Sequence, residues 1–377
     1  MPPEPFQIEV PDFVLRDLRE RLAKTRWPDP LPGETWERGA SLAYVRELCT
    51  YWHDEYDWRA QETALNAYPQ FLSTIDDVDI HFWHVRGKGP APMPLMLVHG
   101  WPGSIFEFHH LIAPLTDPAA HGGDATDAFD VVIPALPGFG FSSKPKEPGW
   151  GPIRIARAFD RLMTQELKYE RYGTQGGDWG GIVTSLMAAE NPERVIGAHL
   201  NFIGTRPTPE QAQSPEAKPY LEHAAAIQRD EMGYNITQAT KPMSLGIAQT
   251  DSPAGIAAWI VEKFRTWSDC NGNIESVFTK DQLLTNIMFY WSTTSIASAA
   301  NIYLESRRDA LGGWPQIKAP VGVAMFPKEL ARAPRSWVES HVNLVHWTEM
   351  PRGGHFAALE QPELLLEDVR AFFRPLR

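Results

Sequence analysis

The segment 172–181 constrains the fold of this chain more than any other. It contains Asp178 at the centre of a small-x-acid-x-small spacing, with Gly176 and Gly180 on either side. A strand that turns directly into a helix requires such small flanking residues, because larger side chains would clash in the turn. The spacing therefore predicts a nucleophile elbow with an aspartate in the place where hydrolases usually carry a serine.

An aspartate held in an elbow can attack an electrophilic carbon and form an alkyl ester. This choice argues against serine esterase chemistry and points to a substrate with a strained or displaceable carbon–heteroatom bond. The alternative is an aspartate that only caps the helix. A plain cap does not need the additional Gly177 and Gly181, so we favour the nucleophile.

Length and charge set the class of protein. A chain of 377 residues with 43% hydrophobic composition can bury a large core, as one large domain or two modest ones. The net charge of −12 argues against nucleic acid or an anionic membrane as a partner. No stretch approaches the roughly 20 apolar residues that span a bilayer. With only Cys49 and Cys270, we expect a soluble protein of the reducing cytoplasm, without a membrane anchor.

Strands and helices alternate along much of the chain, which predicts an α/β fold with a mostly parallel sheet and helices on both faces. The first clear strand is at 78–85. The other expected strands are at 95–98, 130–134, 172–176, 195–202, 321–325 and 344–347, and the expected helices of this part are at 153–167, 181–189 and 363–373.

Two further helical regions flank this pattern. Helices at 13–22 and 41–56 precede the first clear strand, and helices at 219–229, 252–267 and 282–304 interrupt the alternation. The second group is typical of a lid. We therefore expect an N-terminal extension (1–74) that wraps core and lid, a core (75–204 and 311–377), and a helical lid (205–310).

Reactive groups are expected where parallel strands end. His355 lies in a glycine loop after the last strand, where a histidine is suited to act as a general base. The chain order nucleophile, acid, histidine fits this fold class. Glu329 is the first carboxylate after the strand at 321–325, so it is the expected acid, although a lone glutamate is more often an exposed surface residue.

Backbone groups complete the expected site. The segment 99–103 follows a buried strand, and the N–H groups of Trp101 and Trp179 would stabilise negative charge on an ester oxygen of Asp178. His99 is expected to be a structural hydrogen-bonding residue. No histidine pair has a spacing suited to a shared ion, so no metal is assigned.

The lid should supply a proton to an alkoxide leaving group, and a tyrosine could donate it. The candidates are Tyr234, Tyr290 and Tyr303. The residues alone do not choose among them, because a packing aromatic is commoner than a catalytic one.

Together, the segments 99–103, 177–181, 326–329 and 352–356 resemble the epoxide hydrolases of the microsomal type. The N-terminal stretch that ends at 26–28 and the lid block 251–264 are similar to that family as well. The resemblance covers nearly the whole chain. It implies the α/β-hydrolase fold, with a helical lid and an N-terminal meander packed on it.

The resemblance also implies a reaction. An epoxide becomes a vicinal diol through an ester on Asp178, Tyr234 and Tyr303 polarise the epoxide oxygen, and His355, held by Glu329, activates the water. Tyr290 is then left as a packing residue. No cofactor or metal is expected, and the partners are a small apolar epoxide and water, with a homodimer allowed. Detoxification and aromatic hydrocarbon catabolism are the roles expected. The membrane-bound members carry an N-terminal anchor helix that we do not expect here.

Two rival functions remain at this point. A haloalkane dehalogenase also uses an aspartate elbow and a histidine, with halide-binding donors such as the Trp179 side chain in place of tyrosines. A ligand-binding protein on the same scaffold would be expected to lack a member of the triad, and all three members are present in this sequence.

Overall fold

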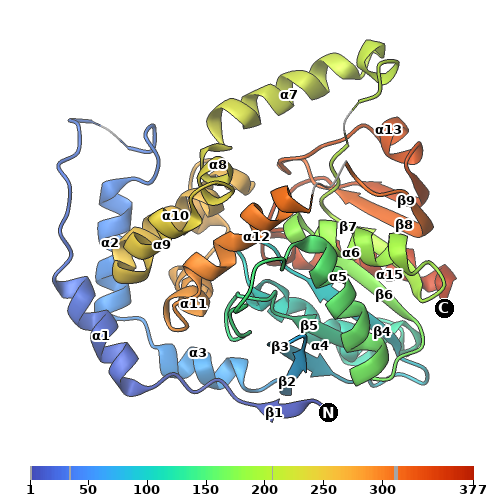
Figure 1. The fold of residues 1–377 in the computed structure, drawn as a ribbon, viewed down its shortest axis with the longest axis horizontal. Helices are drawn as coiled ribbons and strands as arrows, with labels where there is room; N and C mark the ends of the chain where they lie inside the picture. Colours follow the sequence, from blue (N-terminus) through green and yellow to red (C-terminus); the bar gives the residue numbers. More distant parts are fainter. Residues whose placement is uncertain (1, 34, 206, 310–312) are drawn as a thin grey trace.

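The computed structural model describes residues 2–33, 35–205, 207–309 and 313–377, which are built around one nine-stranded sheet (Figure 1). The strands are β1 (Glu4–Phe6), β2 (Gln70–Ile75), β3 (Val78–Val85), β4 (Met93–Val98), β5 (Phe129–Pro134), β6 (Tyr172–Gly176), β7 (Val195–Leu200), β8 (Ile317–Met325) and β9 (Val342–Glu349). Their order in the sheet is β1-β2-β3-β5-β4-β6-β7-β8-β9. The predicted mostly parallel sheet is confirmed, because β5, β4 and β6–β9 run parallel to one another.

The antiparallel edge of the sheet begins earlier in the chain than the sequence indicates. The expectation that 78–85 holds the first strand is wrong, since β1 and β2 precede it and pair antiparallel. β2 and β3 form a hairpin whose two connecting residues, Asp76 and Asp77, both have positive φ (50° and 62°). Such a pair is typical of a tight hairpin turn. An Asp-Asp turn lacks the glycine that usually marks this turn in a sequence.

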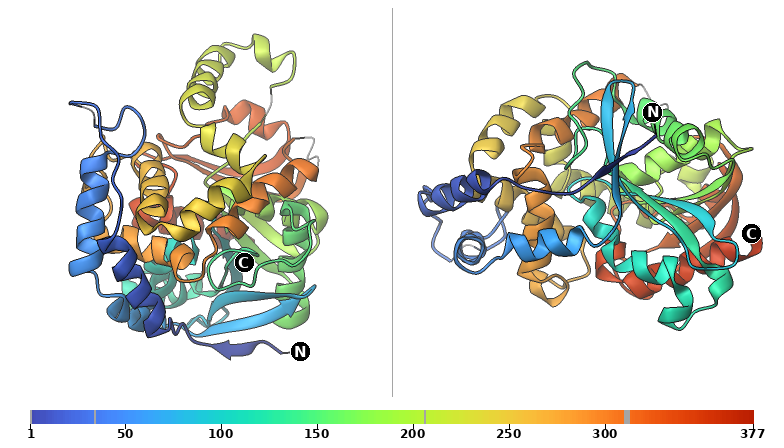
Figure 2. Two further views of the ribbon diagram at one scale, coloured as in Figure 1. Left: turned by 60° about the vertical axis from the view of Figure 1, so that its left-hand side comes forward. Right: turned by 90° about the horizontal axis from the view of Figure 1, so that it is seen from below.

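Helices cover both faces of the sheet. α5 (Pro152–Arg161) packs against α6 (Asp178–Glu190), and α4 (His109–Thr116) packs against α15 (Pro362–Phe373). The right-hand view of Figure 2 shows the two pairs on opposite faces. The strands between them are almost fully buried, as in β5, because parallel strands covered on both sides have no solvent face. The short helices α13 (Arg335–Glu339) and α14 (Ala357–Glu360) complete this part.

Between β7 and β8, the residues that the structure describes form a lid of six α-helices. They are α7 (Ala217–Asp230), which projects away from the body in Figure 1, α8 (Gly233–Gln238), α9 (Pro242–Asp251), α10 (Pro253–Trp267), α11 (Lys280–Trp291) and α12 (Ile296–Arg308). The expected boundary at 310–311 lies outside the described residues.

The expectation of a single helix at 282–304 is wrong, because the structure has two helices there, α11 and α12, separated by residues 292–295. Thr294 takes a positive φ of 53° at the break. The hydroxyls of Ser292 and Thr293 donate to the carbonyls of Met288 and Phe289, at 2.6 Å each. Hydroxyls that bond to the preceding turn compete with the helical ladder, which is why a run of such residues ends a helix.

The N-terminal segment contributes the helices α1 (Asp12–Ala23), α2 (Leu42–Asp54) and α3 (Trp58–Leu65). α1 and α2 contact α10 of the lid, and α2 also contacts α11 (Figure 1). The segment therefore links the lid to the antiparallel edge of the sheet. Among the described residues, no helix is long and apolar enough to cross a membrane.

Candidate active site

Asp178 lies where β6 turns into α6. Its φ is 51°, in the left-handed region that non-glycine residues rarely adopt, which is typical of a strained turn at a functional residue. A Cβ atom on Gly180 would overlap the carbonyl of Val98, so the turn can form only with glycine at this position. The strand–turn–helix that the sequence predicts is present, and the carboxylate of Asp178 lies beside Gly100 and Trp101.

The register of the parallel strands brings the loops that follow β4, β8 and β9 to the edge of the sheet where Asp178 lies. Val98 is opposite Gly176, and Gly176 is opposite Leu200. Farther along, Lys328 and Gly354 form an isolated parallel bridge between the loops that follow β8 and β9. This bridge places the loop of Glu329 beside the loop of His355.

His355 contacts both carboxylates that the sequence assigns to it. Its Nδ1 lies 2.7 Å from Oε1 of Glu329, and its Nε2 lies 3.5 Å from Oδ2 of Asp178. Glu329 is fully buried, which contradicts the alternative of a surface glutamate. The backbone N–H of Leu330 also donates to Oε1 of Glu329, at 2.6 Å. The imidazole is thereby oriented with one nitrogen toward Asp178.

The charges around His355 favour its protonated form. Burial alone would lower its pKa, but the carboxylates of Glu329 and Asp178 outweigh this effect and raise the pKa well above the usual value. Because Asp178 supplies one of these two charges, a loss of its negative charge would weaken what holds the proton on the imidazole.

The backbone of the segment 99–103 points at the aspartate as well. The N–H of Trp101 donates to Oδ1 of Asp178 at 2.8 Å. Trp179 is the second residue of α6, next to Asp178. Both ring nitrogens of His99 bind backbone groups: Nε2 accepts the N–H of Leu136 at 3.2 Å, and Nδ1 lies 2.9 Å from the carbonyl oxygen of Gly100. It therefore has the structural role expected from the sequence.

Tyr234 and Tyr303 lie on different lid helices and are brought together above the elbow. Their ring centroids are 5.7 Å apart, at 84°. The ring of Tyr234 stacks on that of Trp101, with centroids 4.9 Å apart, and the rings of Tyr303 and Trp179 form a T-shaped pair at 4.8 Å. Burial, with the charge of Asp178 added to it, raises the pKa of both phenols above the usual range, so both remain O–H donors at neutral pH.

Tyr290 differs from this pair in its hydrogen bonding. It is buried, and its hydroxyl donates to the carbonyl of Gly103. By contrast, the hydroxyl of Tyr303 is buried and makes no hydrogen bond of regular geometry to any described residue. Tyr303 therefore has a donor to offer to a substrate, whereas the Tyr290 donor is already used.

A carboxyl group that the sequence did not single out lies in the same place. Glu107 lines a small cavity together with Asp178, His355 and Asn201. The signal that could have drawn attention to it is its position four residues after Gly103, in the turn after a buried strand. No three His, Cys, Asp or Glu side chains of the described residues are grouped so that they could hold a metal ion.

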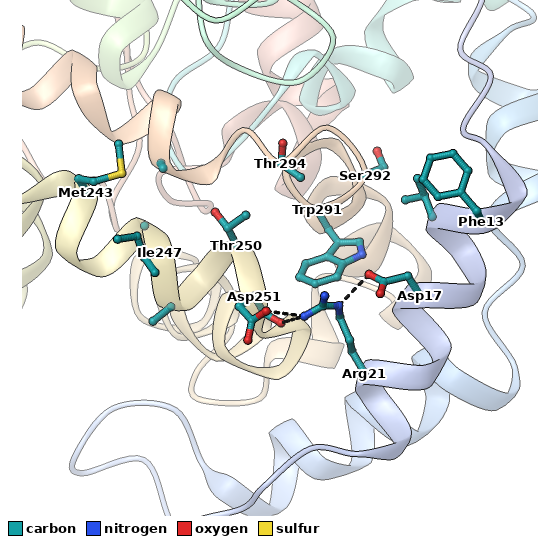
Figure 3. Close-up of a pocket in the computed structure, with 14 residues that line it drawn as sticks. Phe13, Asp17, Arg21, Met243, Ile247, Thr250, Asp251, Trp291, Ser292 and Thr294 are labelled. Atoms are coloured by element: carbon teal, nitrogen blue, oxygen red, sulfur yellow. Dashed lines mark hydrogen bonds and ion pairs between the residues drawn. The ribbon is translucent and has the colours of Figure 1, made fainter.

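A larger hollow of the described surface lies elsewhere. It is an open groove of about 930 Å³ between α1 and the lid helices α9 and α11, lined mostly by apolar side chains such as Phe13 and Ile247. Figure 3 shows Arg21 at its edge, between Asp17 and Asp251. None of the candidate catalytic residues Asp178, Glu329, His355, Tyr234 and Tyr303 lines this groove.

Known proteins show the same organisation. Residues 3–108 match the family described as "Epoxide hydrolase N terminus", and residues 93–220 match the "alpha/beta hydrolase fold". A protein of Stigmatella aurantiaca named "Putative epoxide hydrolase" is 46% identical over 376 residues, which is 99% of this chain and 85% of that protein. The chain belongs to the epoxide hydrolase family.

Other members of this family confirm the likeness over the whole length. "Epoxide hydrolase 1" of Oryctolagus cuniculus is 37% identical, over 98% of this chain and 88% of its own. The solved structure of the juvenile hormone epoxide hydrolase of the silkworm Bombyx mori superposes with a TM-score of 0.90 at 33% identity, over 100% of this chain and 95% of that chain. The epoxide hydrolase of Aspergillus niger gives 0.88 at 30%, over 100% and 97%. The predicted fold, family and enzyme class, a hydrolase of epoxides, are confirmed.

Proposed function

We propose that this epoxide hydrolase forms a covalent ester on Asp178. The carboxylate attacks an epoxide carbon from the side opposite the oxygen, and the carbon–oxygen bond breaks. Tyr234 and Tyr303 donate hydrogen bonds, or a proton, to the oxygen that leaves. The product of this half-reaction is a hydroxyalkyl ester of Asp178.

Water completes the reaction. His355 accepts a proton from a water molecule, which attacks the carbonyl carbon of the ester, and Glu329 stabilises the imidazolium that results. The backbone N–H groups of Trp101 and Trp179 stabilise the oxyanion. The ester bond then breaks, His355 returns the proton to the departing oxygen, and the diol leaves.

One observation carries this proposal. The imidazole of His355 is held between a buried carboxylate on Nδ1 and the elbow aspartate on Nε2, at 2.7 and 3.5 Å. A base in this position can deliver water to the carbonyl carbon of an Asp178 ester. The N–H of Trp101, 2.8 Å from Oδ1, supports the same assignment, because it already faces the oxygen on which charge would develop.

The lid tyrosines favour epoxide opening over dehalogenation. An alkoxide needs a proton as it leaves, whereas a halide needs only donors that hold an anion. Tyr234 and Tyr303 are two neutral phenols above the elbow, and such phenols can give a proton to an alkoxide.

The surroundings of the site suggest what the enzyme binds. Trp101, Trp179 and Trp267 contribute aromatic surface next to the tyrosines, which suits a small apolar epoxide. A cytoplasmic location is supported by Cys49 and Cys270, which are buried and free. A homodimer, and roles in detoxification or aromatic hydrocarbon catabolism, stay predictions.

Single-turnover diol formation in oxygen-18 water tests the mechanism. The enzyme is used in excess over a simple aryl epoxide, and both the diol and the peptide that contains Asp178 are analysed by mass. Label in Asp178 with an unlabelled diol is the expected result. A labelled diol with an unlabelled Asp178 means direct attack by water and contradicts the ester. Halide release from an alkyl halide without diol from any epoxide would favour the dehalogenase.

A further inference from the structure

Glu107 is a carboxyl group at the catalytic centre that the mechanism above does not use. It belongs to a short 3-10 turn, η1 (Ile105–Phe108), and is only partly exposed. Its backbone N–H donates to the carbonyl of Ser104 at 3.0 Å. Within the part of the chain that the structure describes, no side chain pairs with its carboxyl group. The carboxyl group lines the same small cavity as Asp178 and His355, where it is free to bind a polar ligand.

The cavity that Glu107 lines has the size of a single water molecule. Its volume is about 10 Å³, and Asp178, His355 and Asn201 are among the other residues that line it. About 10–15 Å³ of such space is what one water molecule requires, together with polar partners. Neither lid tyrosine lines this cavity. An epoxide held between the phenols and Asp178 would therefore leave it free for water.

Gly103 keeps the carboxyl group in this position. A Cβ atom there would overlap Oε1 of Glu107, so the carboxyl group occupies the space that a side chain at position 103 would fill. The hydroxyl of Tyr290 donates to the carbonyl of Gly103. The absence of a side chain at position 103 thus leaves room for the carboxyl group.

Protonation makes this position compatible with the nucleophile. The pKa of Glu107 is raised to about 8, mainly by burial; the charge of Asp178 also raises it, and that of His355 lowers it. At neutral pH the group is mostly uncharged, so it does not repel the Asp178 carboxylate strongly. In either form its carbonyl oxygen can accept a hydrogen bond.

We propose that the carboxyl group of Glu107 positions the water that hydrolyses the Asp178 ester. The water donates one O–H to Nε2 of His355 and the other to Glu107, which directs its lone pair at the ester carbonyl carbon. A bond forms between the water oxygen and that carbon, the carbonyl electron pair moves to the oxygen near Trp101, and the proton passes to His355. Glu107 neither gains nor loses a proton. This inference rests on the ester mechanism proposed above.

Two variants of Glu107 test the assignment in the full-length enzyme. Glu107→Leu removes the acceptor with little change in size, and Glu107→Gln keeps an acceptor oxygen. Alkylation is followed by tryptophan fluorescence, because Trp101 and Trp179 lie next to the ester and their emission should change when it forms. The amount of ester is measured by mass spectrometry after acid quenching. The leucine variant should slow ester hydrolysis about 10- to 100-fold and change alkylation less than about threefold, whereas the glutamine variant should hydrolyse within about threefold of wild type.

The outcomes separate this inference from the mechanism on which it rests. Wild-type hydrolysis rates in Glu107→Leu would overturn the role of Glu107 alone. Alkylation and hydrolysis that fall together would show a structural role and overturn it as well. A wild-type enzyme that forms no ester would overturn the ester mechanism, and this inference with it.

A variant of Gly103 tests the position of the same carboxyl group. Gly103→Ala should push the Glu107 side chain out of the cavity and slow hydrolysis as the leucine variant does, with an unchanged near-ultraviolet circular dichroism spectrum. Because both changes remove one interaction, the double variant should be no slower than Glu107→Leu alone. If the two effects multiply in full, Gly103 acts by another route and the assignment is overturned.

Discussion

Oε1 of Glu329 lies 2.7 Å from Nδ1 of His355, and neither side chain is open to solvent. A charge-assisted hydrogen bond of this length in a buried place both orients the imidazole and stabilises its protonated form. The two residues come from loops after different strands, so the pair exists only because β8 and β9 are neighbours in the sheet.

Glu329→Gln should therefore act on the second half-reaction. The amide keeps the size of the side chain but removes the charge that stabilises the imidazolium, so ester hydrolysis should slow by about 10²- to 10⁴-fold. Alkylation should be affected much less, and rapid-quench kinetics with one turnover separates the two steps. Glu349→Gln, an exposed glutamate at the end of β9, is the matched control and should leave both rates unchanged. Equal losses in both half-reactions would contradict a role confined to the base.

His355→Gln should trap the ester. Alkylation needs only Asp178 and the lid tyrosines, whereas hydrolysis needs the base, so the variant should accumulate protein heavier by the mass of one substrate molecule. Mass spectrometry of the intact protein after mixing with the epoxide measures this directly. Asp178→Asn in the same background should abolish the adduct. An adduct that persists in the double variant would identify another nucleophile.

The same histidine should make stability depend on pH. The pKa of His355 is raised in the folded protein, so its contribution to the free energy of unfolding is fully present below the unfolded value of about 6.5 and is lost as the pH rises through the folded value. The carboxyl groups that face it are those of Asp178, Glu329, Glu107 and Glu360. The difference in unfolding free energy between wild type and His355→Gln should therefore be larger at about pH 6 than at about pH 9.

Urea unfolding of both proteins at the two pH values measures this difference. Subtracting the variant cancels most titrations elsewhere in the chain, which both proteins share. A difference that stays constant, or that grows toward alkaline pH, would show that the folded protein does not hold the histidine proton.

Tyr234→Phe and Tyr303→Phe should each slow alkylation by about 10²-fold or more, because each removes a donor to the departing oxygen. The ester, once formed, should hydrolyse at nearly the wild-type rate. Tyr290→Phe is the matched control, since this lid tyrosine gives its hydroxyl to the carbonyl of Gly103. Tryptophan fluorescence in a stopped-flow instrument follows alkylation in all three. If Tyr290→Phe were the slow variant, the assignment of the tyrosine pair would be wrong.

These tyrosines also mark the limit of what the sequence can predict. Asp178, Glu329 and His355 could be assigned from the chain because each follows a strand, and strand ends meet at one edge of a parallel sheet. Tyr290 and Tyr303 differ only in their tertiary partners, which local sequence does not encode; only the resemblance to epoxide hydrolases separated them.

The sequence did not predict a role for Glu107 or the break between α11 and α12, and the two omissions have similar causes. Glu107 lies in a short turn and becomes notable only through the cavity it shares with His355. The break between α11 and α12 depends on hydroxyls that bond to the preceding turn, within a segment whose apolar pattern continues on both sides. In each case a long-range contact or a competing hydrogen bond decides the outcome, and neither is visible in hydrophobic periodicity.

The position of Tyr303 depends on how closely α12 approaches α9. A Cβ atom on Gly246 would lie 2.5 Å from Cβ of Ala297, so the two helices touch where only glycine fits. Gly246→Ala should force them apart, which costs about 1–3 kcal/mol of stability for overpacking and displaces the helix that carries Tyr303. Alkylation should slow along with the loss of stability, because the phenol must lie within hydrogen-bond distance of the epoxide oxygen.

Gly233→Ala is the matched control for this variant. It introduces the same methyl group in the lid, one residue before Tyr234, but nothing lies within 4 Å of its Cβ atom. We expect its stability to stay within about 0.5 kcal/mol of wild type or to rise slightly. Thermal unfolding and stopped-flow alkylation should therefore separate the two variants. Equal losses of stability and alkylation rate in the two variants would show that any added methyl group in the lid has this effect. The contact between α9 and α12 would then not position Tyr303.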